Sequence, residues 1–182
     1  MDKRKKTMAE LRNLYDANRQ LTGKTIAAGE HIPPDSYIVV VMIIIQNSRG
    51  DFLIQKRAKN KSFGHMYGLT GGHPKTGETS REGAATELAE ELGIKVNPKD
   101  LQLICARRID AERVFSDIYY LKIDIELDQL KLQPEEVDSA YWFTLYRIRE
   151  ENREGHFAPP HYEELTNALR YGVIDVSKVA KY

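Results

Sequence analysis

The sequence contains a single cysteine, Cys105, among its 182 residues. One thiol cannot form an internal disulfide, which fits a reducing compartment, so we expect a cytoplasmic protein in which Cys105 is a small core residue. The basic start, MDKRKKTMAELR, has no apolar stretch behind it. We therefore expect no secretory signal there and interpret Lys3–Lys6 as a solvated tail.

The chain also lacks an excess of either charge. Lys+Arg and Asp+Glu each number 27, which gives a formal net charge of zero. Nothing in this balance attracts nucleic acid polymers or anionic membranes, so we expect neither as a partner. The longest apolar run, Tyr37–Ile45, is too short to cross a bilayer and is β-branched, which indicates a buried strand.

A hydrophobic content of 41% over this length suits a single domain, which we divide into a lead-in (1–35), a core (36–172) and a C-terminal tail (173–182). A small hairpin is expected around LTGK in the lead-in, and a short strand in KNKSFGHMYGLTGG. The other predicted strands are Tyr37–Gln46, Asp51–Arg57, Leu101–Ile109, Arg113–Ile125 and Ser139–Tyr146. The predicted helices are Thr79–Leu92, Tyr146–Asn152 and Pro160–Tyr171. This order predicts an α/β fold with a mixed, partly antiparallel sheet.

The helix predicted at Thr79–Leu92 carries an unusual concentration of acid. On a helical wheel at roughly 100° per residue, Glu87, Glu90 and Glu91 share one arc beside a separate apolar stripe. Like charges at this spacing repel, and a divalent cation would remove the penalty because hard cations prefer carboxylate oxygens. The alternative is a solvated acidic face on an ordinary helix. The flexible pair Gly71–Gly72 before the helix favours the metal site.

Gly72, Glu78 and the run Thr86–Ile94 resemble the Nudix box, G-x5-E-x7-R-E-U-x-E-E-x-G-U, where U is a bulky aliphatic residue. Every fixed position matches except the Arg, which is Thr86 here. The resemblance implies a Nudix-type α/β/α sandwich and a hydrolase that uses Mg²⁺ or Mn²⁺ to cleave a diphosphate linkage in a nucleoside diphosphate derivative. It assigns metal binding to Gly72, Glu87, Glu90 and Glu91, and counts Glu90 and Glu91 as catalytic. The Arg is thought to hold a neighbouring Glu, which Thr86 cannot do.

The segment Phe52–Pro74 resembles isopentenyl-diphosphate isomerases and their hydrolase-like relatives. A basic pair of those isomerases grips a diphosphate, and Arg57 and Lys61 are its nearest matches. The alternative is a solvated strand end. His73 matches a metal-binding His of the isomerases, although a lone loop His is more often a surface residue. Their catalytic Cys falls at Gly71 in this chain, which disfavours isomerase chemistry.

Nudix proteins often supply a general base from a late loop, and Glu136 in LQPEEVDSAYW is our choice for that role, with Glu112 and Asp117 as rivals. Trp142, in the strand that follows, is expected to pack in the core. We therefore predict a Nudix pyrophosphohydrolase that acts on a small-molecule diphosphate. The alternatives are an isomerase-like activity and a non-catalytic nucleotide-sensing module. A homodimer is left open.

Overall fold

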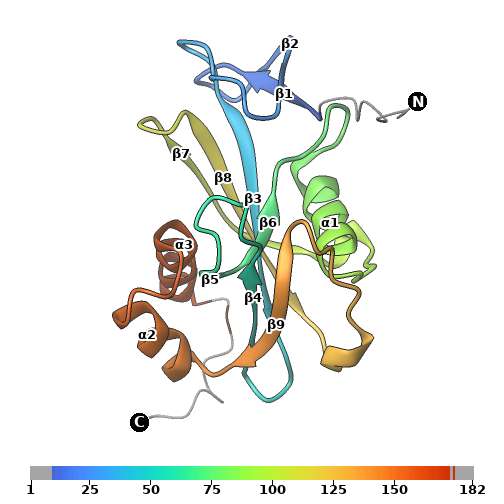
Figure 1. Cartoon of the computed structure of the whole chain (residues 1–182). Helices are drawn as coiled ribbons and strands as arrows, with labels where there is room; N and C mark the ends of the chain where they lie inside the picture. The colour runs from blue at the N-terminus through green and yellow to red at the C-terminus, as the bar shows by residue number, and fades with distance from the viewer. Residues whose placement is uncertain (1–9, 173, 175–182) are drawn as a thin grey trace, which may run out of the picture.

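The computed structural model of the protein describes residues 10–172 and 174. A seven-stranded sheet lies between helix α1 (Ser80–Glu91) on one face and helices α2 (Leu145–Arg153) and α3 (Pro159–Arg170) on the other (Figure 1). This confirms the predicted α/β/α class. The basic run Lys3–Lys6 and most of the predicted C-terminal tail lie outside the described residues.

The sheet combines parallel and antiparallel pairs, as predicted. Its main order is β5-β4-β3-β8-β7; β6 also pairs with β3, and β9 with β4. β3 and β8 are parallel, and the remaining pairs are antiparallel. The strands are β3 (Ile38–Gln46), β4 (Phe52–Arg57), β5 (Tyr67–Gly68), β6 (Thr70–Gly72), β7 (Gln102–Ile109), β8 (Val114–Lys122) and β9 (Val137–Phe143). Short 3-10 turns occupy Pro98–Asp100 and Leu127–Gln129.

Two predicted strands differ from the structure by more than one residue. The strand expected at Arg113–Ile125 ends at Lys122. The strand expected at Ser139–Tyr146 begins earlier, at Val137, and ends at Phe143. It stops there because Thr144 is the N-cap of α2, and its side chain accepts a hydrogen bond from the backbone N–H of Arg147. The capping box predicted for α1 is present, with Thr79 and Glu82 bonded reciprocally.

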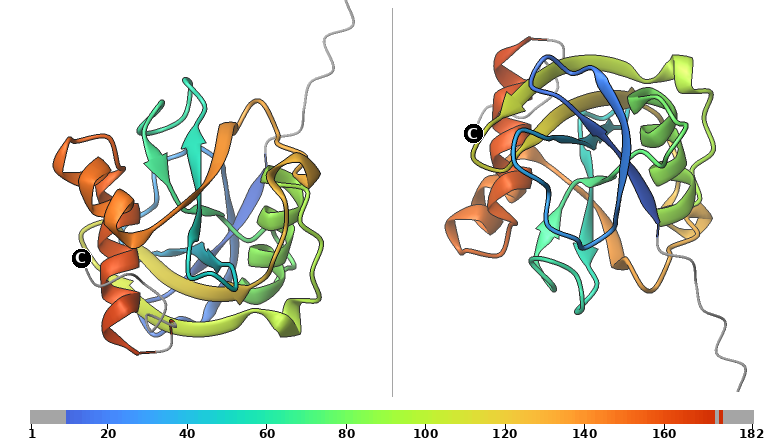
Figure 2. Two further views of the ribbon diagram at one scale, coloured as in Figure 1. Left: turned by 90° about the horizontal axis from the view of Figure 1, so that it is seen from below. Right: turned by 90° about the horizontal axis from the view of Figure 1, so that it is seen from above.

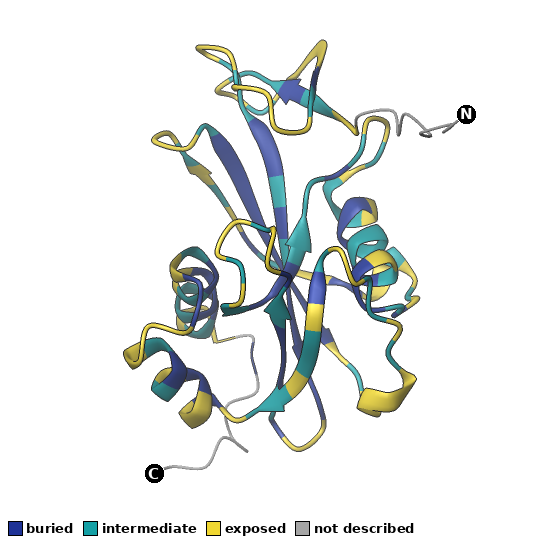
Figure 3. Ribbon diagram, viewed as in Figure 1, coloured by how far each residue is buried: buried dark blue, intermediate teal, exposed yellow. Residues whose placement is uncertain are grey.

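Two hydrophobic cores lie on opposite faces of the sheet, because successive side chains of a strand alternate between its faces. Ile43 on β3 belongs to the core under α1, together with Leu88. Its neighbour Ile44 belongs to the core under α2 and α3, together with Leu165. All four side chains are fully buried, and the strands form the most buried part of the molecule (Figure 3).

The lead-in contains a two-stranded hairpin, but not where the sequence predicted its turn. β1 (Leu11–Tyr15) pairs antiparallel with β2 (Leu21–Ala27), so LTGK lies within the second strand. The turn is set earlier by Asp16, whose Oδ1 accepts hydrogen bonds from the N–H groups of Asn18 and Gln20. Gly23, with φ of 76°, marks the point where the pairing register slips, as in a β-bulge.

The two side chains expected in the core are found there. Cys105 is buried, and its Sγ lies 3.5 Å from the hydroxyl of Tyr171. Trp142 packs against the core under α1 and donates its indole N–H to the carbonyl of Ile125 at 3.1 Å. No helix within the described residues is long and apolar enough to cross a membrane.

A buried histidine links α3 to the strands that lead to α1. Nδ1 of His161 accepts the backbone N–H of Leu69 at 3.0 Å, and only a glycine fits at position 68, since a Cβ there would approach Nδ1 to 2.9 Å. The other ring nitrogen must therefore carry the proton in the neutral form. Burial, with a contribution from the charge of Arg57, lowers the pKa of His161 to about 4.

This buried histidine predicts a specific acid sensitivity. The unfolded chain binds a proton at His161 below about pH 6.5 and the folded one only below about pH 4, so stability is lost as pH falls through that window, by up to about 3 kcal/mol. His161→Asn keeps an acceptor near Nδ1 but cannot titrate. Denaturant unfolding from pH 7 to pH 4 should show the stability gap between wild type and variant closing on acidification. A constant gap would contradict the assignment.

Candidate active site

The glycine pair before α1 lets a carboxylate approach the main chain closely. The carboxylate of Glu87 lies against Gly72, where a Cβ would overlap it. Its Oε1 also accepts the backbone N–H of His73 at 3.0 Å. Gly71 in turn packs on β3, and a Cβ there would overlap the carbonyl oxygen of Val41. Both glycines are therefore required by packing, and together they bring β6 under the acidic face of α1.

Glu91 is the most deeply placed acid of the box, with a relative exposure of 4%. Its Oε2 accepts hydrogen bonds from Nε2 of Gln55 at 3.2 Å and from the N–H of Gly71 at 3.3 Å. The side chain of Gln55 is itself oriented by the hydroxyl of Thr70, which donates to it at 3.2 Å. Gln55 was not predicted from the sequence. Its signal was a polar side chain on the core face of β4, two positions after Leu53.

The environment of these two acids favours their neutral form. Burial and the nearby charge of Glu91 raise the pKa of Glu87 to about 8, although the hydrogen bond from the backbone of His73 acts to lower it. Burial raises the pKa of Glu91 to about 7, although the hydrogen bonds from Gln55 and Gly71 act to lower it. Two carboxyl groups that resist ionisation together near neutral pH form a donor set that a divalent cation would stabilise.

Glu90, the third acid of the cluster, is exposed at the rim and forms an ion pair with Lys75. The substituted box position points elsewhere: the hydroxyl of Thr86 donates to Oε1 of Glu78 at 2.7 Å. The other oxygen of Glu78 accepts the N–H of Lys75 at 2.8 Å. Thr86 thus holds the loop before α1 through Glu78.

A cleft of about 400 Å³ brings together every residue assigned to the site from the sequence. Those residues are Arg57, Lys61, Gly72, Glu87, Glu90, Glu91 and Glu136. Five further residues line the cleft and were not predicted from the sequence: Glu10, Arg12, Gly29, Ser62 and Gln133. Glu10, Arg12, Gly29 and Gln133 belong to segments that lie far from the box along the chain, and Ser62 follows the predicted Lys61 without a motif of its own.

The two basic residues from β4 and the loop after it, Arg57 and Lys61, differ in their partners. Nε of Arg57 donates to the carbonyl of Ser62 at 2.8 Å, and among the described residues its guanidinium has no carboxylate partner. Lys61 instead forms an ion pair with Glu136. Burial lowers the pKa of the Arg57 guanidinium, which nevertheless stays charged. An unneutralised guanidinium in a cleft is suited to bind an anion.

The rivals for the base lie outside this cleft. Asp117 is 1% exposed and is held by Arg19 and the hydroxyl of Ser80. Glu112 lines other hollows, one of them beside α3. His73 does line the cleft, and burial lowers its pKa to about 3, so its ring is neutral at physiological pH. Of the three proposed bases, Glu136 alone faces the acids of α1.

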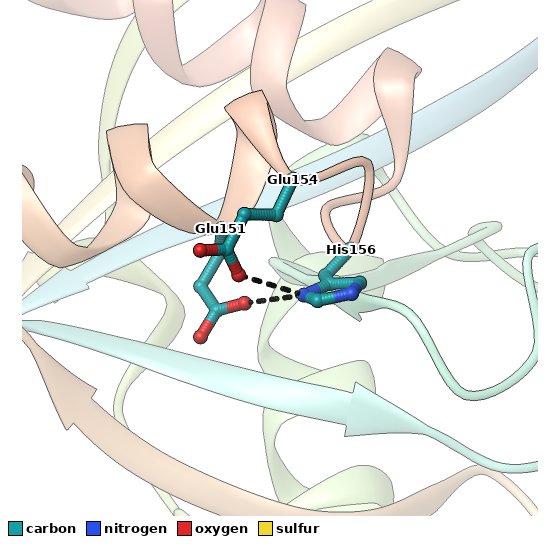
Figure 4. Close-up of side chains that lie close together, drawn as sticks. All are labelled: Glu151, Glu154 and His156. Atoms are coloured by element: carbon teal, nitrogen blue, oxygen red, sulfur yellow. Dashed lines mark hydrogen bonds and ion pairs between the residues drawn. The ribbon is translucent and has the colours of Figure 1, made fainter.

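A second acidic cluster lies at the end of α2, on the opposite face of the sheet. Glu151, Glu154 and His156 place one potential ligand atom each within 4.8 Å of one another (Figure 4). Glu151 is paired with Arg147, and its Oε2 lies 2.9 Å from Nδ1 of His156. These contacts account for the cluster as a cap that ties the turn after α2 back to the helix.

The sheet, the glycine pair and the acidic helix define a Nudix-type hydrolase fold. The NUDIX domain model matches residues 36–165. An uncharacterized Nudix hydrolase of Listeria monocytogenes is 34% identical over 149 residues, which are 81% of this chain and 87% of the relative. The chain belongs to the Nudix hydrolase family, and these matches support its assignment as a Nudix pyrophosphohydrolase.

Solved structures agree on the fold. The protein DR0079 of Deinococcus radiodurans superposes with a TM-score of 0.67 at 22% identity, covering 82% of this chain and 92% of its own. A bifunctional NMN adenylyltransferase/ADP ribose pyrophosphatase of Francisella tularensis, solved with AMP and a manganese ion, gives a TM-score of 0.57 at 20% identity. That match covers 78% of this chain and 43% of the larger protein.

The raised pKa values of Glu87 and Glu91 generate a prediction about metal and stability. In the metal-free protein, Glu87→Gln/Glu91→Gln should melt at or above the wild-type temperature, because the variant loses an unfavourable carboxylate pair. Mg²⁺ or Mn²⁺ should raise the melting temperature of the wild type and have much less effect on the variant; saturation a hundredfold above Kd adds about 2.7 kcal/mol. Equal shifts in both proteins would place the metal elsewhere.

Proposed function

We propose that this protein requires Mg²⁺ or Mn²⁺ and hydrolyses a diphosphate linkage in a nucleoside diphosphate derivative. One observation carries the proposal: Glu87 and Glu91 share a cleft with Arg57, a guanidinium that lacks a carboxylate partner among the described residues. The acids suit a hard cation and the guanidinium suits a phosphate. The cleft therefore offers a donor set for each part of a metal-bound diphosphate.

The cation would be held by Glu87, Glu90 and Glu91 with the backbone of Gly72. The residues fit it because Glu91 is buried beside the half-buried Glu87, and both carboxyl groups ionise reluctantly without a positive charge. Glu90 would exchange its present partner, Lys75, for the cation. A divalent cation at this place would offset phosphate charge and make a water molecule more acidic.

Arg57 and Lys61 would orient the diphosphate. In the structure Lys61 is paired with Glu136. A substrate phosphate that binds Lys61 would separate this pair, and the carboxylate of Glu136 would then be available to take a proton from the attacking water. Attack at phosphorus would break the P–O–P anhydride, leaving a nucleoside monophosphate and a phosphorylated remainder. Holding the reactants in line would supply a large part of the rate enhancement.

The nucleotide part of the proposal draws support from the Francisella tularensis structure, which contains AMP and manganese. At 20% identity this likeness concerns the fold alone, so the group attached to the diphosphate is left to experiment. The cytoplasmic location and the open question of a homodimer stay as predicted from the sequence.

The two alternatives have less support. An isomerase-like activity needs an acid at position 71, and Gly71 is packed so tightly on Val41 that a side chain there would displace β3 or β6. Incubation with isopentenyl diphosphate tests it directly. A non-catalytic nucleotide sensor was suggested only by Thr86, which now has a structural role through Glu78. All four box carboxylates are retained, and a binder has no evident need for them.

The proposal predicts turnover of one class in a panel of nucleoside diphosphates, dinucleotides, nucleotide sugars and coenzyme A derivatives with Mg²⁺. Arg57→Ala should raise KM for the active compound by about 10- to 100-fold, the usual loss for one charge-assisted hydrogen-bonding group. Lys59→Ala removes an exposed charge from the same loop and should behave as wild type.

These measurements separate the proposal from its alternatives. Tight nucleotide binding without any product would favour the sensor. Unchanged KM and kcat in an active Arg57→Ala variant would mean that Arg57 is only a solvated strand end.

A further inference from the structure

The N-terminal hairpin lies outside the residues that match the family model, yet it forms one wall of the cleft. Seen from above, it runs across the end of the sheet towards α1 (Figure 2). The carbonyl of Leu11 accepts hydrogen bonds from both the N–H and the hydroxyl of Thr76, at 3.0 Å each, so β1 is tied to the loop that precedes α1. Arg12 of this strand and Glu10, the residue just before it, line the cleft.

The hairpin is fastened to the sheet by an ion pair whose carboxylate is buried. Arg19 lies in the turn of the hairpin. The N–H groups of both its terminal nitrogens donate to the carboxylate of Asp117, with 2.7 Å between Nη1 and Oδ1. Its guanidinium also lies 5.2 Å from the centre of the Phe115 ring. Asp117 on β8 is 1% exposed, and a buried carboxylate that loses its partner is strongly destabilising. The hairpin, and with it Arg12, is therefore fixed relative to β8.

Arg12 stands out among the cations near the cleft. Lys61 forms an ion pair with Glu136, and Lys75 forms one with Glu90. Nε of Arg57 donates a hydrogen bond to the carbonyl of Ser62. Within residues 10–172 and 174, the side chain of Arg12 forms no hydrogen bond or ion pair, and its Nε is buried without a partner. A buried N–H without an acceptor costs about 1–3 kcal/mol, which a bound ligand could recover.

The chemistry of this group specifies its ligand. A guanidinium presents parallel N–H donors that match two oxygens of one phosphate, and it is less strongly hydrated than an ammonium. Glu10 and Glu87 are the acids whose charges act most strongly on Arg12, so the group lies near the acids assigned to the cation. A phosphate that bridges the cation and Arg12 would satisfy both.

We infer that Arg12 is a second phosphate-binding residue, supplied by the N-terminal hairpin, which binds the substrate diphosphate from the side of Glu87 while Arg57 binds it from the side of β4. The inference rests on the proposed function for its substrate. It adds a residue from outside the matched domain, and it makes substrate affinity depend on the hairpin.

The test compares Arg12→Ala, Arg12→Lys and Lys24→Ala. Lys24 is exposed on β2 of the same hairpin, so its variant removes an equal charge without touching the cleft. Arg12→Ala should raise KM by about 10- to 100-fold with a smaller change in kcat. Arg12→Lys should recover only part of the loss, since an ammonium lacks the planar fork. Lys24→Ala should match wild type. Melting temperatures within a few degrees of wild type would show that the variants fold.

Binding of inorganic pyrophosphate with Mg²⁺, measured by calorimetry, gives a readout independent of turnover. Wild type should bind it at least tenfold more tightly than Arg12→Ala. If wild type turns over a substrate and neither KM nor pyrophosphate affinity changes in Arg12→Ala, the inference is wrong and the proposed function stands. If no compound is hydrolysed but pyrophosphate binding still depends on Arg12, the proposed function fails and the phosphate site stands. An Arg12→Ala variant that changes only the response to Mg²⁺ would show that Arg12 merely balances the charge of Glu87.

Discussion

The contact between the acidic face of α1 and the backbone of Gly71–Gly72 is the constraint on which the site depends. The carboxylates of the buried Glu91 and the half-buried Glu87 accept hydrogen bonds from main-chain N–H groups. Burying like charges together is unfavourable, and the raised pKa values of both acids express that cost. The apolar side of the same helix offsets it, because Ala84, Leu88 and Leu92 are fully buried against the sheet.

The sheet supplies rigidity to this contact from both sides. β3 pairs with β6 and thereby positions the glycines, and the same strand pairs in parallel with β8, which holds Asp117. On the opposite face, His161 of α3 receives the N–H of Leu69 and fills the space beside Gly68. The acids are thus supported through hydrogen-bonded strands that connect both hydrophobic cores. A site held on rigid elements loses less free energy when it orders a charged ligand.

Four segments distant in sequence meet at the cleft. α1 supplies the acids, β4 and its loop supply Arg57 and Lys61, the loop before β9 supplies Glu136, and the hairpin supplies Arg12. Acidic and basic groups therefore line the same cleft, so that a cation and a phosphate can be bound side by side. The pairs Lys61–Glu136 and Lys75–Glu90 keep part of this charge balanced within the protein itself.

Local sequence was sufficient wherever spacing alone defines geometry. The capping box at Thr79, the three acids on one arc and the glycine pair could all be placed from the chain, because helix periodicity and glycine's lack of a Cβ act over short distances. The hairpin turn was misplaced because Gly23 serves a bulge, and only strand pairing distinguishes the two uses. Tertiary structure alone decided that Gln55 holds Glu91 and that Arg12 reaches the cleft with no side-chain partner among the described residues. Those outcomes depend on which strands become neighbours, and pairing between distant segments leaves no periodic signal in the sequence. The contact of Thr86 with Glu78 depends on how the loop before α1 folds back onto the helix.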